Sequence, residues 1–172
     1  SFTQDDLATL QPHFSSFVGI DSDGCVFDTM EVKQKQHFHP IIIEHYNLQP
    51  IEKNLRAAAA FVNLYSKWRG RNRFPNLLRV FQLLQAWPEV KQSGVELPQT
   101  TDLEAYVDSG LALGNPSLKA EAERTGSAEL QRVYEWSVAV SDSIDTTMQR
   151  IHPLEWAVKS LHKIKSNSDA IV

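Results

Sequence analysis

Apolar residues recur with helical spacing along most of the chain. In the segment NLLRVFQLLQAW, residues 76–87, they gather on one side of a helix: Leu77, Leu78, Phe81 and Leu84. The same kind of pattern predicts helices over residues 31–46, 51–68, 102–113, 128–144 and 154–165, with a kink or break at Pro40. Nearly all of the chain after Met30 is therefore expected to be helical.

Capping residues and helix breakers indicate where these helices begin and end. Thr101, with Glu104 three residues later, has the pattern of a capping box, and Ser127 precedes another helical run. Pro153 opens the last expected helix. The segment RGRNRFP, residues 69–75, is expected to be a loop between two helices.

The segment FVGI, residues 17–20, is short, apolar and compatible with a strand, and it ends at Asp21. It predicts a buried strand, central in a parallel sheet, and the final residues 169–172 (DAIV) are expected to start a second strand. Strand, helix and strand form a parallel βαβ unit, here with roughly 120 helical residues inserted. The predicted fold class is α/β, a Rossmann-type parallel sheet with a large inserted α-helical domain.

Acidic residues follow the expected first strand directly. Ligands of open parallel sheets bind beyond the carboxyl ends of the strands, where Asp21 and Asp23 are placed, and Gly24 lets the backbone turn sharply. Two close carboxylates favour a cation, and Mg²⁺ binds one or two of them together with substrate phosphate and water. Asp21 is then able to attack phosphorus, with Asp23 as the general acid and base.

Composition narrows the classes of function. The 172 residues are 42% hydrophobic and 22% charged, with a net charge of −4. A mildly acidic chain is a poor general binder of nucleic acid, which requires a basic face. No apolar run approaches the ~18 residues of a membrane span, and the N-terminal segment is too polar for a signal peptide. The single cysteine, Cys25, suits a reducing cytosol, so a cytoplasmic location is expected.

The segment GIDSDGCVFDT, residues 19–29, resembles the first motif of the haloacid dehalogenase (HAD) superfamily. In that motif a hydrophobic strand is followed by Asp-x-Asp-Gly-x-x-x-Asp-Thr or Ser. The resemblance implies that Asp21 is the nucleophile and that Asp23 is the general acid and base of a phosphohydrolase. It also implies that the Asp21 carboxylate and the Asp23 backbone carbonyl bind Mg²⁺. The implied substrate is a small phosphorylated metabolite.

The layout of the chain is similar to the phosphatase-like branch of this family, which Asp28 and Thr29 also match. That branch carries a helical cap after the first motif. Cys25 departs mildly, because most members have Thr there. The expected organisation has three parts: a core strand and catalytic turn (1–30), a helical cap (31–150), and a return helix with the start of the second core strand (151–172).

The later motifs of the family are a Ser or Thr after the second strand, a Lys, and an acidic pair. The sequence ends at Val172, inside the expected second strand, and Lys159, Lys163 and Lys165 all precede that strand. We therefore expect the N-terminal part of a HAD enzyme, with only the first part of its sheet present. On this basis we expect these residues alone to lack phosphatase activity, and we expect self-association or pairing with the remaining core.

Two alternatives stay open. Within the enzyme class, a phosphomutase or a phosphonatase shares the same first motif. Outside it, the chain is a non-catalytic truncated segment or a partner-binding helical module. A calcium-binding EF-hand loop starting at Asp21 is excluded, because Cys25, Val26 and Val32 stand where that loop needs an acidic or amide residue, a glycine and a glutamate.

Arginines occupy alternate positions of the expected loop, at Arg69, Arg71 and Arg73. Arginine binds phosphate and carboxylate bidentately, so these three residues, with Gly24, are candidates for substrate binding. The alternative interpretation is a solvated loop. The three histidines of the first helix lack an acidic partner at metal-ligand spacing and are expected at the surface or at the cap interface: His37, His39 and His45.

Overall fold

The computed structural model describes residues 9, 11, 18–148 and 151–167. The chain divides into two compact units, one formed by residues 1–28 with 151–172 and the other by residues 29–150. None of the described helices is long and apolar enough to cross a membrane.

The predicted α/β fold is wrong for the described residues, which form helices and turns but no strand. A strand needs a neighbouring strand to take its N–H and C=O groups. The backbone that follows Val18 to Ile20 instead bonds to itself, and an isolated parallel bridge joins Asp23 to Phe27 within one turn. The second expected strand, residues 169–172, lies outside the described residues. The described fold is therefore mostly helical.

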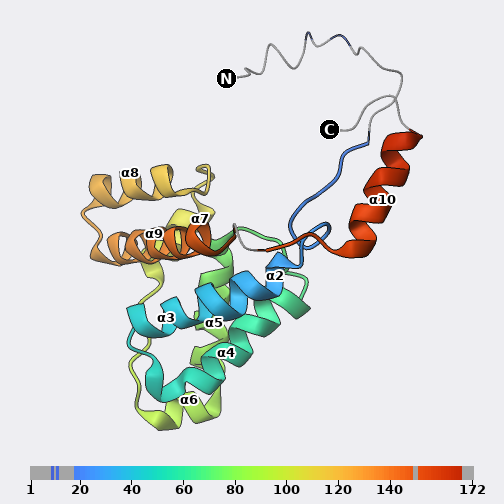
Figure 1. Cartoon of the computed structure of the whole chain (residues 1–172). Helices are drawn as coiled ribbons and strands as arrows, with labels where there is room; N and C mark the ends of the chain where they lie inside the picture. The colour runs from blue at the N-terminus through green and yellow to red at the C-terminus, as the bar shows by residue number, and fades with distance from the viewer. Residues whose placement is uncertain (1–8, 10, 12–17, 149–150, 168–172) are drawn as a thin grey trace. The chain divides into compact units, whose positions relative to one another are not determined.

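Residues 29–150 form a helical unit, coloured from blue to orange in Figure 1. Two of its elements, η1 and η3, are π-helices, and η2 is a 3₁₀-helix. In chain order the elements are α2 (Thr29–Val32), η1 (Lys33–Phe38), α3 (His39–His45), η2 (Gln49–Ile51), α4 (Glu52–Ala60), η3 (Phe61–Tyr65), α5 (Arg73–Ala86), α6 (Pro88–Ser93), α7 (Thr101–Asp108), α8 (Asn115–Thr125) and α9 (Ala128–Met148). The helix α9 packs against α8, α7, α3 and η1, so it connects the last part of the unit to the first.

The predicted first helix is present, but its hydrogen bonding changes near Pro40. Proline has no N–H, and its ring crowds the carbonyl group four residues earlier in an α-helix. Immediately before it the helix widens, and the His39 N–H donates to the Gln34 carbonyl five residues back. The chain thus runs from α2 through the wider η1 into α3 without a break. Short π-helical segments inside α-helices are frequent at functional sites.

Aromatic rings fill the core of the helical unit. Three edge-to-face pairs connect its helices: Phe74–Tyr106 (5.8 Å between ring centroids), Tyr46–Phe81 (5.2 Å) and Phe38–Trp136 (6.0 Å). Tyr106 and Trp136 are buried, each with 1% of its surface exposed. Full burial of one large apolar side chain stabilises a fold by about 1.5–3 kcal/mol, so these rings are major contributors to the stability of the unit.

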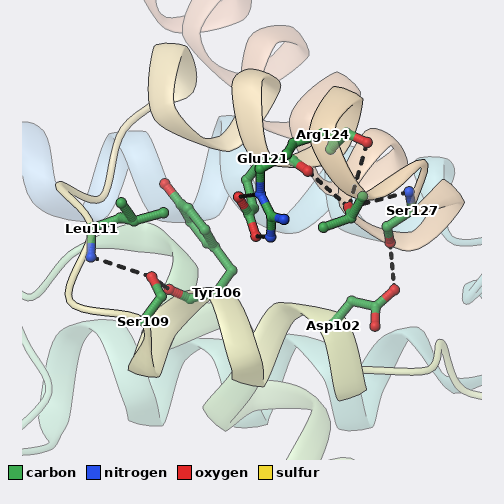
Figure 2. Close-up of polar contacts among 9 residues, drawn as sticks. Asp102, Tyr106, Ser109, Leu111, Glu121, Arg124 and Ser127 are labelled. Atoms are coloured by element: carbon green, nitrogen blue, oxygen red, sulfur yellow. Dashed lines mark hydrogen bonds and ion pairs between the residues drawn. The ribbon is translucent and has the colours of Figure 1, made fainter.

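The start of α9 is held by a cap that the sequence predicted. The Ser127 hydroxyl oxygen accepts a hydrogen bond from the Leu130 N–H at 3.1 Å, and the hydroxyl donates to the Asp102 carboxylate of α7. Figure 2 shows this contact together with the Glu121–Arg124 ion pair near the end of α8. One serine therefore both caps α9 and connects it to α7.

The start of α7 does not use the predicted capping box. The residue that flanks the helix is Thr100, not Thr101, and its side chain forms no capping hydrogen bond. The Glu104 N–H donates to the Thr100 backbone carbonyl. The Leu103 N–H donates instead to the Glu129 carboxylate of α9 at 2.7 Å. A backbone N–H in the first turn of α7 therefore finds its acceptor on a different helix.

The other unit contains the acidic turn, residues 21–28, and α10 (Glu155–Ser166), which confirms the last predicted helix. The Leu154 N–H, just before α10, donates to the Val26 carbonyl at 2.8 Å. Val26 and Ala157 are both buried. The acidic turn is thus fastened to the beginning of α10 by its own backbone.

Candidate functional site

The acidic turn is closed by backbone hydrogen bonds that converge on Ser22. The Ser22 carbonyl accepts from the N–H groups of Val26 at 3.1 Å and Phe27 at 3.0 Å. The Gly24 N–H donates in return to the Phe27 carbonyl at 2.8 Å, and Gly24 has a φ of 74°, which favours glycine. The Gly24 N–H therefore takes part in closing the turn, and the positive φ of Gly24 allows the chain to reverse its direction.

The side chains of Asp21 and Asp23 are exposed on this turn. Their oxygens are hard ligands, and Mg²⁺ typically uses one or two carboxylates and keeps several waters. The donor chemistry therefore fits Mg²⁺. Among the residues that the structure describes, no cluster of three or more His, Cys, Asp or Glu residues is arranged to hold a metal ion. Any ion here would need further oxygens from water or from a phosphate group.

The three loop arginines have different environments. Arg69 is exposed and donates to the Leu64 carbonyl at 3.3 Å. Arg71 is exposed and lies over the ring of Trp68, with its guanidinium carbon 4.6 Å from the ring centroid. Arg73 is not in a loop, because α5 begins there, with the Asn72 side chain capping the helix through the Phe74 N–H.

Arg73 is partly buried and connects α5 to α9. Its Nη1 atom donates to the Ser137 carbonyl at 2.9 Å and to the Ser141 hydroxyl at 3.0 Å. Its guanidinium also lies 5.3 Å from the centroid of the Phe38 ring. Burial lowers the pKa of the Arg73 guanidinium. Arg73 therefore has a structural role in the helical unit in addition to any role in binding.

Arg71 and Arg73 line a pocket of about 310 Å³ within the helical unit, which we call the outer pocket. Its polar lining residues are Lys33, Gln34, Arg71, Arg73, Ser141 and Asp145. Arg69 is not among the described residues that line it. A smaller cavity of about 60 Å³, the inner recess, shares Gln34, Arg71 and Arg73 with it and is also lined by Trp136. Two of the three predicted arginines are thus brought together.

Two of the three histidines of the first helix are buried inside this unit. His37 and His39 have 5% and 2% of their surfaces exposed, so neither is a surface residue. The pKa of His39 is lowered to about 4, mainly by burial and in addition by the positive charges of Arg56 and Lys35. Their burial follows from the path of η1 and α3 against α9, which the periodicity of a single helix does not reveal.

The sequence did not point to Gln34, Trp136 or Ser141. The local signal that could have drawn attention to Gln34 was Pro40 inside a helical pattern. Proline distorts helices, and π-helical distortions are frequent at functional sites. Comparison with known proteins found no matching family model, no matching curated protein and no matching solved structure.

Proposed function

We propose that the protein carrying this sequence is a Mg²⁺-dependent phosphohydrolase that acts on a small phosphorylated metabolite through a phosphoryl group carried on Asp21. The observation that supports the proposal is the acidic turn. Its backbone is closed by hydrogen bonds, and it carries two exposed carboxylates two residues apart, Asp21 and Asp23. The resemblance of residues 19–29, which include both carboxylates, to the first HAD motif also supports it.

The proposed roles follow from the chemistry of the two carboxylates. The Asp21 carboxylate attacks phosphorus and forms an acyl phosphate, while the ester oxygen leaves. Asp23 donates a proton to that leaving oxygen and afterwards takes a proton from the water that hydrolyses the acyl phosphate. Mg²⁺, when bound by the Asp21 carboxylate and the Asp23 carbonyl, supplies positive charge that offsets repulsion between the nucleophile and the phosphate.

The closed backbone of the turn supports these proposed roles. A nucleophile must be held near its target, because a misplacement of about 1 Å can cost roughly 10²-fold in rate. The hydrogen bonds to the Ser22 carbonyl fix the backbone on the C-terminal side of Asp21, and the Leu154–Val26 bond ties the turn to α10. A cytoplasmic location fits the single cysteine, Cys25, and forms part of the proposal.

The test is a hydrolysis assay of the protein at its natural length, with and without Mg²⁺, on a panel of phosphate esters. We expect Mg²⁺-dependent release of phosphate, a phosphorylated Asp21 in acid-quenched samples by mass spectrometry, and no turnover by the variant Asp21→Asn. Full turnover by Asp21→Asn would contradict the proposal. A complete lack of hydrolysis would favour the alternative, a non-catalytic helical module.

The same assay separates the related enzyme classes. A phosphomutase would return the phosphoryl group to a second hydroxyl of the substrate, so it would yield an isomeric ester and little free phosphate. A phosphonatase would release phosphate from a carbon–phosphorus compound and leave ordinary esters intact. Product analysis by ³¹P NMR distinguishes all three outcomes.

A further inference from the structure

The outer pocket carries an excess of positive charge. Three cationic side chains line it, Lys33, Arg71 and Arg73, against one carboxylate, Asp145. Neither of the two arginines forms an ion pair with a carboxylate of the described residues. The N-terminal end of the fourteen-residue helix α5 lies at Arg73, and a helix dipole favours negative charge there. The outer pocket therefore suits an anionic group.

Two residues that line the inner recess each carry a buried polar atom that has no hydrogen-bond partner in the described structure. One is the Gln34 Oε1 atom, an acceptor, and the other is the Trp136 Nε1 atom, a donor. Their residues are 7% and 1% exposed. A buried polar atom without a partner costs about 1–3 kcal/mol, so both atoms favour a molecule that satisfies them.

A hydroxyl group meets both requirements at once, because it donates one hydrogen bond and accepts others. It is able to donate to Gln34 Oε1 and to accept from the Trp136 Nε1–H. An ammonium group offers no acceptor for the indole and would be repelled by the adjacent arginines. A small volume of about 60 Å³ suits a group of this size.

We propose that the helical unit binds a small molecule that carries both an anionic group and a hydroxyl group. Its anionic group occupies the outer pocket beside Arg71 and Lys33, and its hydroxyl enters the inner recess between Gln34 and Trp136. The two cavities share Gln34, Arg71 and Arg73, so one compact ligand is able to span them. Arg73 is held by α9 and contributes charge, whereas Arg71 is the exposed arginine of the pair.

This inference goes beyond the proposed function, because it uses only residues 29–150 and needs no turnover. Binding is measured at equilibrium and in the absence of turnover. Loss of hydrolysis with binding intact, or the reverse, therefore separates a failure of one proposal from a failure of the other.

The experiment is isothermal titration calorimetry of the 172-residue chain with three probes: glycerol 3-phosphate, inorganic phosphate and glycerol. We expect glycerol 3-phosphate to bind most tightly, inorganic phosphate to bind more weakly, and glycerol to show no measurable binding. Arg71→Ala should weaken binding of both anions by roughly tenfold or more, which is the usual size of a charged hydrogen bond. Asp145→Asn should strengthen both, because it removes the opposing charge.

A matched control separates a site from a general charge effect. Arg79→Ala removes the same charge from an exposed arginine of α5 that does not line either cavity among the described residues. It should leave both affinities unchanged. Equal losses in Arg71→Ala and Arg79→Ala, or equal affinities of the unmodified chain and Arg71→Ala, would overturn the proposal.

The hydroxyl part of the proposal has its own readout. Gln34→Met removes the acceptor at similar size and should reduce the preference for glycerol 3-phosphate over inorganic phosphate by roughly fivefold or more. In ¹⁵N-labelled protein, the Trp136 indole N–H resonance should shift with glycerol 3-phosphate and stay in place with inorganic phosphate. A resonance that responds equally to both probes, or to neither, would show that no hydroxyl enters the recess.

Discussion

The Nδ1 atom of His37 in η1 lies 2.7 Å from the hydroxyl oxygen of Ser143 in α9, across 106 positions of sequence. The His37 ring is buried, and its other nitrogen, Nε2, has no hydrogen-bond partner in the described structure. The contact with Ser143 therefore satisfies one of the two nitrogens of this buried ring. It also joins the first turns of the helical unit to its last helix.

Removing this contact should weaken the fold. Ser143→Ala leaves the His37 ring without its partner, and we expect the free energy of unfolding to fall by about 1–3 kcal/mol. Urea unfolding followed by circular dichroism measures the loss. Ser143→Thr keeps the hydroxyl and should lose less than Ser143→Ala, and the reverse order would show that packing rather than the hydrogen bond decides the effect.

His39 should make the fold sensitive to mild acid. Its pKa is about 4 in the folded chain, below its ordinary value of 6.5, so between these pH values the unfolded chain binds a proton that the folded chain does not. The free energy of unfolding should therefore fall as the pH falls from 6.5 to 4, by up to about 3 kcal/mol from this group, and level off below. His39→Leu should flatten this part of the pH profile.

The control for this prediction is His162→Leu, which changes an exposed histidine of α10. Urea unfolding midpoints at several pH values compare the two variants. A slope that His39→Leu and His162→Leu reduce equally would mean that burial of the His39 ring does not cause the acid sensitivity.

Ser127 should carry a measurable share of the stability at the start of α9. Ser127→Ala removes the cap and the bond to Asp102, and we expect a loss of about 1–2 kcal/mol. Asn and Asp are equally good caps, but Asp would place a second negative charge against Asp102. Thermal unfolding should therefore rank Ser127→Asn above Ser127→Asp, and the addition of Asp102→Asn should remove that difference.

The effect of Asp23 on the rate should be largest for substrates with poor leaving groups. If it protonates the leaving oxygen, Asp23→Asn should slow hydrolysis by roughly 10²–10⁴ for alkyl esters, and much less for aryl esters whose leaving groups are acidic. Steady-state rates across aryl phosphates of graded leaving-group pKa provide the measurement. A uniform loss across that series would contradict the role of Asp23 as the proton donor.

The helices of this protein could be predicted because their signals are local. The cap at Ser127 and the span of α10 both follow from residues within one or two turns of each other. The predicted strand at Val18 to Ile20 failed for the opposite reason. A strand depends on a partner elsewhere in the chain, and an apolar run of four residues does not identify one.

The candidate binding site was predicted only in part, because it is assembled across distant segments. Arg71 and Arg73 attract attention in the sequence through their charge. Gln34 and Trp136 do not, since an amide and an aromatic ring in helical positions resemble ordinary surface and core residues. They meet only because α9 returns to η1, and no local pattern encodes that meeting.

The bond between the Leu103 N–H and Glu129 has a consequence for the order of events on the ribosome. Translation delivers α7 before Glu129 has been added to the nascent chain, so the first turn of α7 cannot be completed at that time. Ser143 and Ser137, the partners of His37 and Arg73, lie further along α9 and are added later still. The early helices therefore keep apolar surface exposed until α9 has been synthesised, and the helical unit completes its packing only then.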